Sequence, residues 1–396
     1  NSENPVVDVA KKLKIELCEI NPEKDGPSGI FNIYEKESEY SLPDESDEAL
    51  VLHTSGTTSR PKIVPLTNKN IFSSAENISK SLNLSENDHC LNIMPLFHIH
   101  GLIAILASSM KAGASVCASN GFNAIKFLDI AKSEKITWYS GVPTMHQAIL
   151  LRASRNLEIA KVLKLRLIRS SSASLPPAVF KDLNDVFNCP VIEAYGMTEA
   201  THQMTSNPLP PKQQKAGFVG LPAGPEVCIM NENGEVLKQG DEGEVCIKGE
   251  NVTLGYDNNE EANKTSFTNG WFRTGDQGYF DNEGYLKISG RLKEIINKGG
   301  EKISPLEVDN VLMDHPLIDQ AVCFGYEDKM LGENIASAII IKSGETCSEN
   351  DVLEYAQEKL AKFKIPKKIF FVEEIPKGAT GKLQRNVLAK KFGLNN

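Results

Sequence analysis

The sequence lacks the features that mark secreted, membrane-spanning or zinc-binding proteins. Its eight cysteines stand singly, without a C-x-x-C pair, which argues against a zinc or redox motif and against a disulfide framework. No apolar run approaches the roughly 20 residues that a helix needs to cross a bilayer, and the first residues do not follow the pattern of a signal peptide. We therefore expect a cytoplasmic protein without a membrane span.

An excess of positive charge is also missing. The formal net charge of −9 argues against general nucleic-acid binding, because surfaces that bind nucleic acids are usually basic. The nearest approach to a basic stripe is a group of four lysines near the C-terminus: Lys362, Lys364, Lys367 and Lys368. Such a group is either a solvated face or a landing site for a phosphate-rich ligand.

The length and the apolar pattern predict an α/β protein with two domains. A chain of 396 residues exceeds the roughly 250–300 residues at which a single core stops growing. Strands and helices alternate, and residues from about 216 to 290 are richer in strands. We predict a large N-terminal α/β domain over residues 1–292, which includes this β-rich part, and a small α+β C-terminal domain over residues 293–396.

Individual elements can be predicted from short signals. Residues 191–196, 243–249 and 285–290 have the composition of strands, and Asp281–Gly284 is expected to form a turn before the last of them. Ser304-Pro305-Leu306-Glu307 fits a capping box with proline at the first helical position, so a helix should begin there.

The apolar run at residues 49–52 predicts a buried strand, which leads into the hydroxyl-rich turn "TSGTTSRPK". A helix capped by Thr67 should follow. A turn between strand and helix that exposes backbone N–H groups and short hydroxyls can hold phosphate. Its spacing is not that of the P-loop, and a Ser/Thr-rich turn considered alone is more often only a turn. The candidate phosphate ligands are Thr54, Ser55, Gly56, Thr57, Thr58 and Lys62.

Five stretches of the sequence, taken together, favour phosphate binding by this turn over an ordinary turn. "TSGTTSRPK" is followed by "YGMTEA" (195–200), "WFRTGD" (271–276), "GRLKEIINKGGEKISPLEVD" (290–309) and "PKGATGKLQR" (376–385). In this order they resemble the signatures of the adenylate-forming enzymes, which include acyl-CoA synthetases, luciferases and the adenylation domains of peptide synthetases. The resemblance covers nearly the whole chain from about residue 49 onward.

The resemblance implies a two-step reaction. A carboxylate attacks the α-phosphate of Mg-ATP to give an acyl-adenylate and pyrophosphate, and a thiol, usually that of CoA, then displaces AMP. Because charge builds on the phosphates, a cation and preorganised donors should do most of the work. The implied ligands and co-substrates are thus ATP, Mg²⁺, CoA and a small carboxylic acid, with no nucleic-acid partner.

The resemblance also implies roles for single residues. Lys382 matches the catalytic lysine that bridges the carboxylate and the α-phosphate, Thr198 matches an α-phosphate ligand, and Glu199 matches the acid associated with magnesium. The nucleotide would be held by the hydroxyl-rich turn, by an adenine loop with a stacking ring, and by two ribose contacts. Besides the turn, these residues are Ser172, Ala173, Ser174, Tyr195, Gly196, Asp276 and Arg291.

The second step needs another arrangement of the small domain. Lys293 stands at the hinge position of the family, where a pivot has to absorb a backbone change. Gly299 and Gly300 would line the channel for the CoA arm, because glycine permits close approach. The lysines at 362–368 would then contact the CoA phosphates.

The acid is suggested by a second resemblance. His98 matches a position that lines the acyl pocket, and "MTEATHQMTSNPLPP" with "TSRPK" is most similar to the oxalate–CoA ligase branch of the family. His202, His98, Ser172 and Ser174 could bind a second carboxylate there; the alternative is that His202 makes only a structural hydrogen bond. His98 and His100 lack a third ligand in sequence reach, so zinc is not expected.

Two departures from the family pattern leave rival functions open. Ile63 replaces a usual glycine, and a β-branched residue does not easily take a positive φ, so the loop geometry or activity could differ. In the family that the sequence resembles, the phosphate turn lies well over a hundred residues into the chain, whereas here it begins at residue 54. The first part of the large domain is therefore expected to be missing, as in a fragment, a proteolytic core or a truncated gene product. The alternatives to an oxalate–CoA ligase are an adenylation domain that loads a carrier protein, a luciferase-type oxygenase and a non-catalytic nucleotide-binding scaffold.

Overall fold

The structure is a computed structural model that describes residues 5–18, 20–22, 31–33, 41–54, 61–378 and 382–394. The chain divides into two units, residues 1–44 and 45–396. The first unit contains helix α1 (Pro5–Leu13) and the antiparallel strands β1 (Ile20–Pro22) and β2 (Phe31–Ile33). All other elements described below belong to the second unit.

The large sheet of the second unit has the strand order β11-β10-β9-β8-β7-β5-β6. The strands β6, β5, β7, β8 and β9 are parallel, and β10 and β11 continue the sheet in antiparallel pairing. Their bounds are β5 (His89–Asn92), β6 (Ser115–Ala118), β7 (Trp138–Gly141), β8 (Leu167–Ser170), β9 (Val191–Met197), β10 (His202–Ser206) and β11 (Leu221–Pro222).

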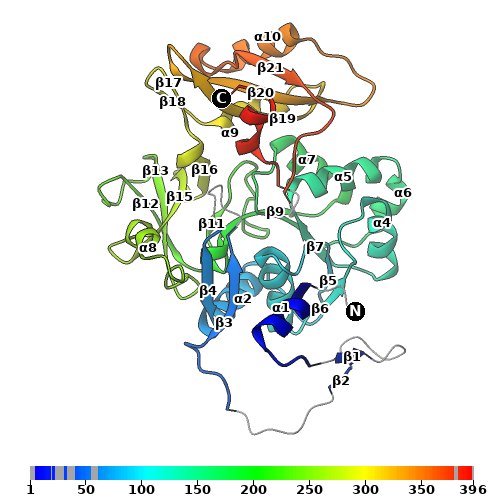
Figure 1. Ribbon diagram of the computed structural model, residues 1–396. Coiled ribbons are helices and arrows are strands. Elements are labelled where there is room, and N and C mark those ends of the chain that lie inside the picture. The colour runs from blue at the N-terminus through cyan, green and yellow to red at the C-terminus, as the bar shows by residue number, and fades with distance from the viewer. Residues whose placement is uncertain are drawn as a thin grey trace. The chain divides into compact units, whose positions relative to one another are not determined.

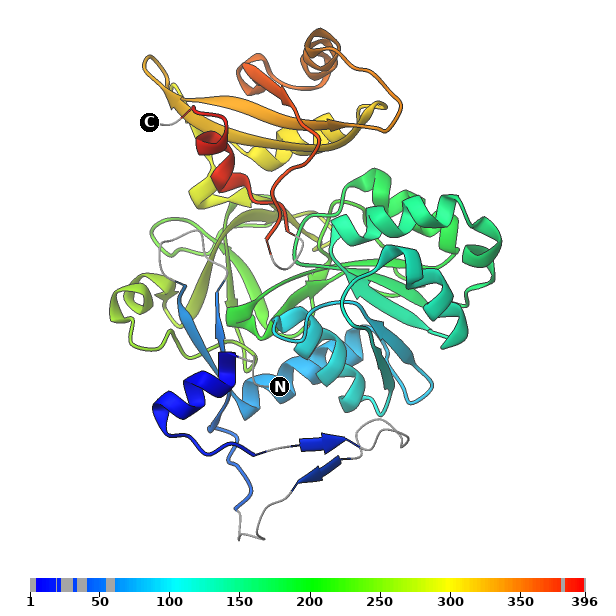
Figure 2. The same ribbon diagram turned by 45° about the vertical axis from the view of Figure 1, so that its right-hand side comes forward.

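Helices cover this sheet, so β7 and β8 are buried at every position, as parallel strands covered on both faces usually are. Figures 1 and 2 show α4, α5, α6 and α7 gathered beside one face, away from α2. The bounds are α2 (Asn68–Ser81), the π-helix His100–Ala107, α3 (Ser108–Lys111), α4 (Ala124–Ser133), α5 (Pro143–Ser154), α6 (Leu157–Val162) and α7 (Pro177–Phe187).

The β-rich part forms a second sheet with the order β12-β13-β15-β14, to which β16 adds by pairing with β15. The predicted turn at Asp281–Gly284 is confirmed, because the Asp281 carboxylate accepts hydrogen bonds from the backbone N–H groups of Glu283 and Tyr285. The bounds are β12 (Glu226–Met230), β13 (Gly243–Lys248), α8 (Glu260–Ser266), β14 (Phe267–Thr268), β15 (Trp271–Phe280) and β16 (Leu286–Arg291).

The C-terminal part has its own sheet, β18-β17-β20-β19, with β21 parallel to β20, and its own apolar clusters. Its elements are β17 (Ile296–Lys298), β18 (Glu301–Ile303), α9 (Pro305–Met313), β19 (Ile318–Asp328), β20 (Gly332–Ile341), α10 (Glu349–Lys359), β21 (Lys368–Phe371), α11 (Leu388–Lys391) and the 3₁₀ turns Leu292–Glu294, Lys362–Lys364 and Arg385–Val387. The predicted fold class is confirmed: a large N-terminal α/β domain is followed by a small C-terminal domain. The boundary at residue 293 stays a prediction.

Two local predictions need correction. The hydroxyl-rich turn does not lead directly into a helix: β3 (Glu48–His53) pairs with β4 (Ile63–Thr67), and α2 begins only after β4. Because β3 lies in a two-stranded ribbon, its residues alternate in exposure, and Val51 is 51% exposed rather than buried. Thr67 caps α2 as predicted.

The second correction concerns the start of α9. The helix begins at Pro305 as predicted, but the Ser304 hydroxyl donates to the Ser289 carbonyl oxygen of β16 and makes no capping bond. Glu307 pairs instead with Lys364, at 2.7 Å. The hydroxyl therefore links α9 to the β-rich part of the chain.

None of the helices in the described part of the chain has both the length and the apolar character needed to cross a membrane.

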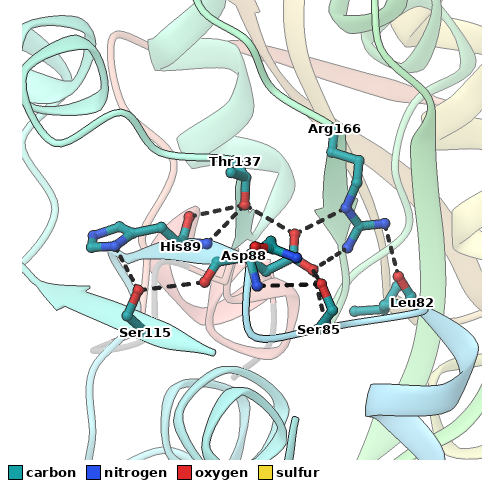
Figure 3. A network of polar contacts seen from close by, with 8 residues as sticks. Leu82, Ser85, Asp88, His89, Ser115, Thr137 and Arg166 are labelled. Atoms are coloured by element: carbon teal, nitrogen blue, oxygen red, sulfur yellow. Dashed lines mark hydrogen bonds and ion pairs between the residues drawn. The ribbon is translucent and has the colours of Figure 1, made fainter. Parts of the chain in front are cut away.

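A polar network fixes the amino ends of the parallel strands (Figure 3). The Asp88 carboxylate is 4% exposed and accepts two hydrogen bonds from Arg166, at 2.9 and 3.0 Å. It also accepts from the Thr137 hydroxyl at 3.0 Å and from the Ser85 backbone N–H at 2.9 Å. Arg166 in turn donates to the Leu82 carbonyl oxygen after α2. The network joins the segments before β5, β7 and β8.

We expect Asp88→Ala to lower the free energy of unfolding by roughly 1.5–3 kcal/mol, the usual contribution of hydrogen bonds to a charged group. The loss follows because Arg166, Thr137 and the Ser85 N–H would lose a common acceptor. Urea denaturation measures it. Asp185→Ala is the control, since Asp185 pairs with Lys181 on the exposed surface and its substitution should change stability by less than about 1 kcal/mol. Equal effects of the two substitutions would contradict the structural role of Asp88.

Candidate active site

The carboxyl ends of the parallel strands converge on one region, as ligand sites of open α/β sheets do. Ser172 follows β8, Thr198 and Glu199 follow β9, and His98 lies between β5 and the π-helix. Ser172 has φ +74, a backbone conformation that non-glycine residues rarely adopt and that is concentrated at functional sites. Ala173 and Ser174 continue the same loop, with Ala173 exposed and Ser174 half-buried.

The predicted ribose residues meet in the structure. Asp276 and Arg291 are paired in register between β15 and β16, and Arg291 Nε donates to Asp276 Oδ1 at 3.1 Å. The Tyr195 hydroxyl donates to the other carboxylate oxygen of Asp276. Burial raises the pKa of Asp276, and the Arg291 charge opposes that shift. The Tyr195 ring is thus fixed beside the two candidate ribose ligands.

Close packing of the backbone requires glycine at position 196, in addition to the predicted role of Gly196 in nucleotide binding. A Cβ atom at this position would lie 1.7 Å from the carbonyl oxygen of His202. Only glycine therefore allows β10 to pass this closely beside β9 before the chain reaches Thr198 and Glu199.

Glu199, the predicted magnesium-associated acid, is held by a residue that the sequence analysis missed. The Tyr256 hydroxyl donates to Glu199 Oε1 at 2.7 Å, and Glu199 is 7% exposed. Lys62 Nζ lies 4.1 Å from the centroid of the Tyr256 ring. Burial lowers the pKa of Lys62, and the nearby Glu199 charge opposes this. Tyr256 is a single aromatic residue in a loop, so its position beside Glu199 had no sequence signal.

The base of the candidate phosphate turn is described, and its tip is not. The Thr54 N–H donates to the Lys62 carbonyl oxygen at 2.9 Å, and the Lys62 N–H donates to Thr54 Oγ1 at 3.2 Å. The predicted ligands Ser55, Gly56, Thr57 and Thr58 lie outside the described residues. Ile63 is the first residue of β4, where the extended backbone suits a β-branched side chain. The structure therefore requires no positive φ at this position.

Lys382 reaches the same region from the small domain. It lies in the connection of residues 376–384, whose described ends are joined by two backbone hydrogen bonds. The Gly378 N–H donates to the Lys382 carbonyl oxygen and the Gln384 N–H donates to the Pro376 carbonyl oxygen, both at 2.8 Å. The pKa of Lys382 is lowered to about 8, mainly by burial and also by the Arg291 charge, while the charges of Asp276 and Glu199 oppose this shift. The side chain is thus close enough to the candidate ribose and magnesium residues for their charges to act on it.

Three histidines also lie close enough to Lys382 for its charge to act on them. Burial lowers the pKa of His98 to about 4, and the Lys382 charge contributes to that shift. His100 and His202 are fully buried, with their ring centroids 5.0 Å apart, and their pKa values are well below the ordinary range, mainly because of burial. The structure thus brings the predicted acyl-pocket residues together, and it adds His100, which sequence reasoning had considered only as a zinc ligand.

A buried arginine belongs to the same group. Arg169 of β8 is fully buried and donates to Ser140 Oγ at 3.4 Å, to His202 Nδ1 at 3.4 Å and to Gln203 Oε1 at 3.2 Å. Sequence analysis missed Arg169, although a charged residue in the otherwise uncharged strand directly before the adenine loop was a usable signal. We call Arg169, Ser140, His100, Ser172 and His202 the Arg169 cluster.

The remaining predicted residues are placed as follows. Lys293 lies in the 3₁₀ turn Leu292–Glu294, and its charge lowers the pKa of Lys62. Gly299 and Gly300, with φ +63 and +98, form the turn between β17 and β18. No group of three or more His, Cys, Asp or Glu side chains suited to a metal ion occurs among the residues that the structure describes.

Comparison with known proteins assigns the class. The AMP-binding enzyme family matches residues 2–257, and the AMP-binding enzyme C-terminal domain matches residues 307–382. The chain therefore belongs to the AMP-binding enzyme family, which confirms the resemblance to adenylate-forming acid–thiol ligases.

The relatives narrow the class further. The chain is 48% identical over 396 residues to the oxalate–CoA ligase of Arabidopsis thaliana, covering 98% of the chain and 77% of the relative. It is 50% identical over 349 residues to the oxalate–CoA ligase of Saccharomyces cerevisiae, covering 88% of the chain and 64% of the relative. It is thus an acid–thiol ligase homologue similar to oxalate–CoA ligases, and shorter than both.

Solved structures agree with this fold. ATP-bound MatB from Rhodopseudomonas palustris superposes with a TM-score of 0.83 at 31% identity, covering 88% of the chain and 69% of that protein. The O-succinylbenzoate–CoA synthetase MenE from Bacillus subtilis, in complex with ATP and magnesium ion, gives a TM-score of 0.78 at 34% identity, covering 89% and 73%. Relatives with this fold therefore bind ATP, and MenE binds it with magnesium.

Proposed function

We propose that the chain is an ATP-dependent acid–CoA ligase that activates oxalate, or another small dicarboxylic acid, as an acyl-adenylate. The observation that carries the proposal is the position of Lys382 between two groups of candidate residues. The charges of Arg291, Asp276 and Glu199, the candidate nucleotide residues, act on its pKa. Its own charge lowers the pKa values of His98, His100 and His202 in the candidate acyl pocket. A cation in this place can stabilise the charge that develops between a carboxylate and a phosphate.

In the first step a carboxylate oxygen of the acid attacks the α-phosphorus of ATP. The new acyl–phosphate bond forms as the bond to the β-phosphate oxygen breaks, and pyrophosphate leaves. Lys382 would neutralise the developing charge, and Thr198 would donate to the α-phosphate. Asp276 has the paired oxygens needed to accept both ribose hydroxyls, with Arg291 holding its carboxylate in place.

The pyrophosphate end would be held by Thr54, Lys62 and the turn between them. Glu199 fits Mg²⁺, because it is a buried carboxylate with one oxygen already oriented by Tyr256, and Mg²⁺ needs few protein ligands when water and phosphate complete its shell. Bound magnesium would supply charge neutralisation on the phosphates.

In the second step the CoA thiolate attacks the acyl carbonyl carbon, and AMP leaves with the electron pair of the broken bond. Lys293 is the proposed pivot of the small domain between the two steps, and Gly299 and Gly300 the proposed channel for the CoA arm. The small domain would have to turn because Lys382 occupies the reacting region in the arrangement described above.

A cytoplasmic location of the protein stays a prediction.

The choice of acid is supported by the similarity to two oxalate–CoA ligases and by the polar character of the candidate pocket. His98, His202 and Ser172 are polar at positions where an apolar acid would require apolar side chains. Isotope exchange between pyrophosphate and ATP, measured with oxalate, malonate, acetate, a medium-chain fatty acid and a cinnamate, tests the proposal. Exchange should be fastest with oxalate; exchange with a fatty acid alone would overturn the choice of acid.

CoA dependence separates the remaining alternatives. AMP release in the presence of the preferred acid should require CoA if the chain is a CoA ligase. Exchange that proceeds while AMP release ignores CoA would favour a domain that loads a carrier protein. ATP binding without exchange for any acid would favour the non-catalytic scaffold.

The adenylation rate should depend on pH through Lys382. Its pKa of about 8 means that the side chain is charged below this pH and neutral above it, so kcat/KM for ATP should fall about tenfold per pH unit above pH 8. Lys382→Arg removes the titration, because arginine stays charged throughout this range. A rate profile measured with both proteins checks this; an unchanged alkaline limb in Lys382→Arg would assign the titration to another group.

A further inference from the structure

Arg169 carries a positive charge that no carboxylate in the described part of the chain neutralises. The side chain is fully buried, and within the described residues no carboxylate forms an ion pair with it. Its three hydrogen-bond acceptors, Ser140, His202 and Gln203, are all neutral groups, and its Nε has no partner among the residues that the structure describes. Burial accordingly lowers the pKa of this arginine to about 9. A buried unpaired charge is costly. An anion that binds beside Arg169 would therefore lower the free energy of this site.

The hydrogen bond to His202 determines where the proton of this ring lies. A guanidinium group only donates, so the 3.4 Å contact makes His202 Nδ1 an acceptor. A neutral imidazole with an accepting Nδ1 carries its proton on Nε2. His202 Nε2 is buried and has no partner among the described groups. The ring therefore presents a donor that awaits an acceptor.

The rest of the cluster links this donor to the reacting region. His100 Nε2 lies 2.6 Å from Ser140 Oγ, to which Arg169 also donates, and His100 Nδ1 lies 3.1 Å from Ser172 Oγ. The cluster is thus continuous from the buried arginine to the loop after β8. The Lys382 charge contributes to the lowered pKa values of His100 and His202, which places the cluster within a short distance of the catalytic lysine.

We infer that Arg169 determines the specificity for a second carboxylate on the substrate: its guanidinium supplies the compensating charge and holds His202 as the tautomer whose Nε2–H donates to that carboxylate. This inference rests on the proposed function, since it concerns the acid of the same reaction. Because the cluster includes Ser172 in the loop after β8, the second carboxylate would bind beside the reacting region, and we expect the two carboxylates of the substrate to be joined by few atoms. The site selects short diacids over longer ones and over acids with an uncharged end.

Oxalate and oxamate provide a matched pair of substrates, because they have almost the same shape and differ in whether the far group is a carboxylate or a neutral amide. The ratio of kcat/KM for oxalate to kcat/KM for oxamate, measured by pyrophosphate exchange, should fall roughly 10- to 100-fold in Arg169→Met. This factor corresponds to the usual free-energy contribution of a hydrogen bond to a charged group. Arg169→Lys should retain part of the ratio. His202→Gln, with Arg169 intact, should lower the ratio as well.

Arg155→Gln is the control, because Arg155 is exposed and should leave the ratio unchanged. An equal loss for both acids in Arg169→Met and His202→Gln would show that the cluster is only structural and would overturn the inference. If the wild type exchanges with no acid, the proposed function fails instead. In that case, calorimetric binding of oxalate is measured in the presence of a non-hydrolysable ATP analogue. Binding that is unaffected by Arg169→Met contradicts the role of Arg169, and weaker binding in Arg169→Met supports it.

Discussion

Lys382→Ala should lower the rate of acyl-adenylate formation by about 10²–10³-fold, the usual cost of removing a preorganised donor to a developing charge. ATP should still bind within a few-fold, because the proposed ribose contacts Asp276 and Arg291 pair with each other and do not depend on Lys382. The second step, started from a synthetic acyl-adenylate and CoA, should be nearly unaffected, since the lysine acts only during adenylation in the proposed mechanism.

Pyrophosphate exchange and single-turnover thioester formation measure the two steps separately. Lys377→Ala is the matched control, because Lys377 lies on the same connection, forms a bridge with Leu383 and is exposed. It should leave both steps unchanged. Equal losses in Lys377→Ala and Lys382→Ala would mean that the connection as a whole matters and that Lys382 has no special role.

Asp309→Ala should lower the free energy of unfolding by about 3–5 kcal/mol, the usual result of removing one partner of a buried ion pair. Asp309 is 4% exposed and accepts from Arg385 Nη2 at 2.6 Å and from Nη1 at 3.3 Å. It also accepts from the Cys323 N–H. The substitution would leave Arg385 with Glu294 and the Cys323 carbonyl oxygen as partners.

The same substitution should also slow adenylation, because Arg385 follows Lys382 by three residues and fixes that connection to α9 and β19. Denaturation and pyrophosphate exchange of the same preparation measure both effects. Asp319→Ala is the control, since Asp319 is exposed on β19. Unchanged stability in Asp309→Ala would show that the Arg385–Glu294 pair, at 3.2 Å, is sufficient to hold Arg385.

Elements with strong local signals could be predicted from the sequence. The strands at 191–197, 243–248 and 286–291 and the start of α9 lie where apolar patterns and proline placed them. The bonding of Ser304 could not be predicted, because its partner Ser289 belongs to another strand. The strand β4 was missed because proline at position 65 and the adjacent turn obscured a short strand.

The candidate site was predictable where a motif is contiguous. Asp276, Arg291, Glu199 and Lys382 stand in recognisable stretches, and the structure brings them into one region. Residues that act through long-range contacts carried little signal. Tyr256 lies 57 residues from Glu199 along the chain, and Arg169 meets His202 only because β8 and β10 both lie beside β9.

The most direct test of the proposed function is to identify and quantify the products of one reaction. Purified protein is mixed with ATP, magnesium, CoA and oxalate, and the CoA species, AMP and pyrophosphate are quantified by mass spectrometry. We predict oxalyl-CoA, AMP and pyrophosphate in equal amounts, with far less thioester when acetate replaces oxalate. Bound ATP that stays intact with every acid, or a thioester formed equally well from acetate, would contradict the proposed small-diacid–CoA ligase.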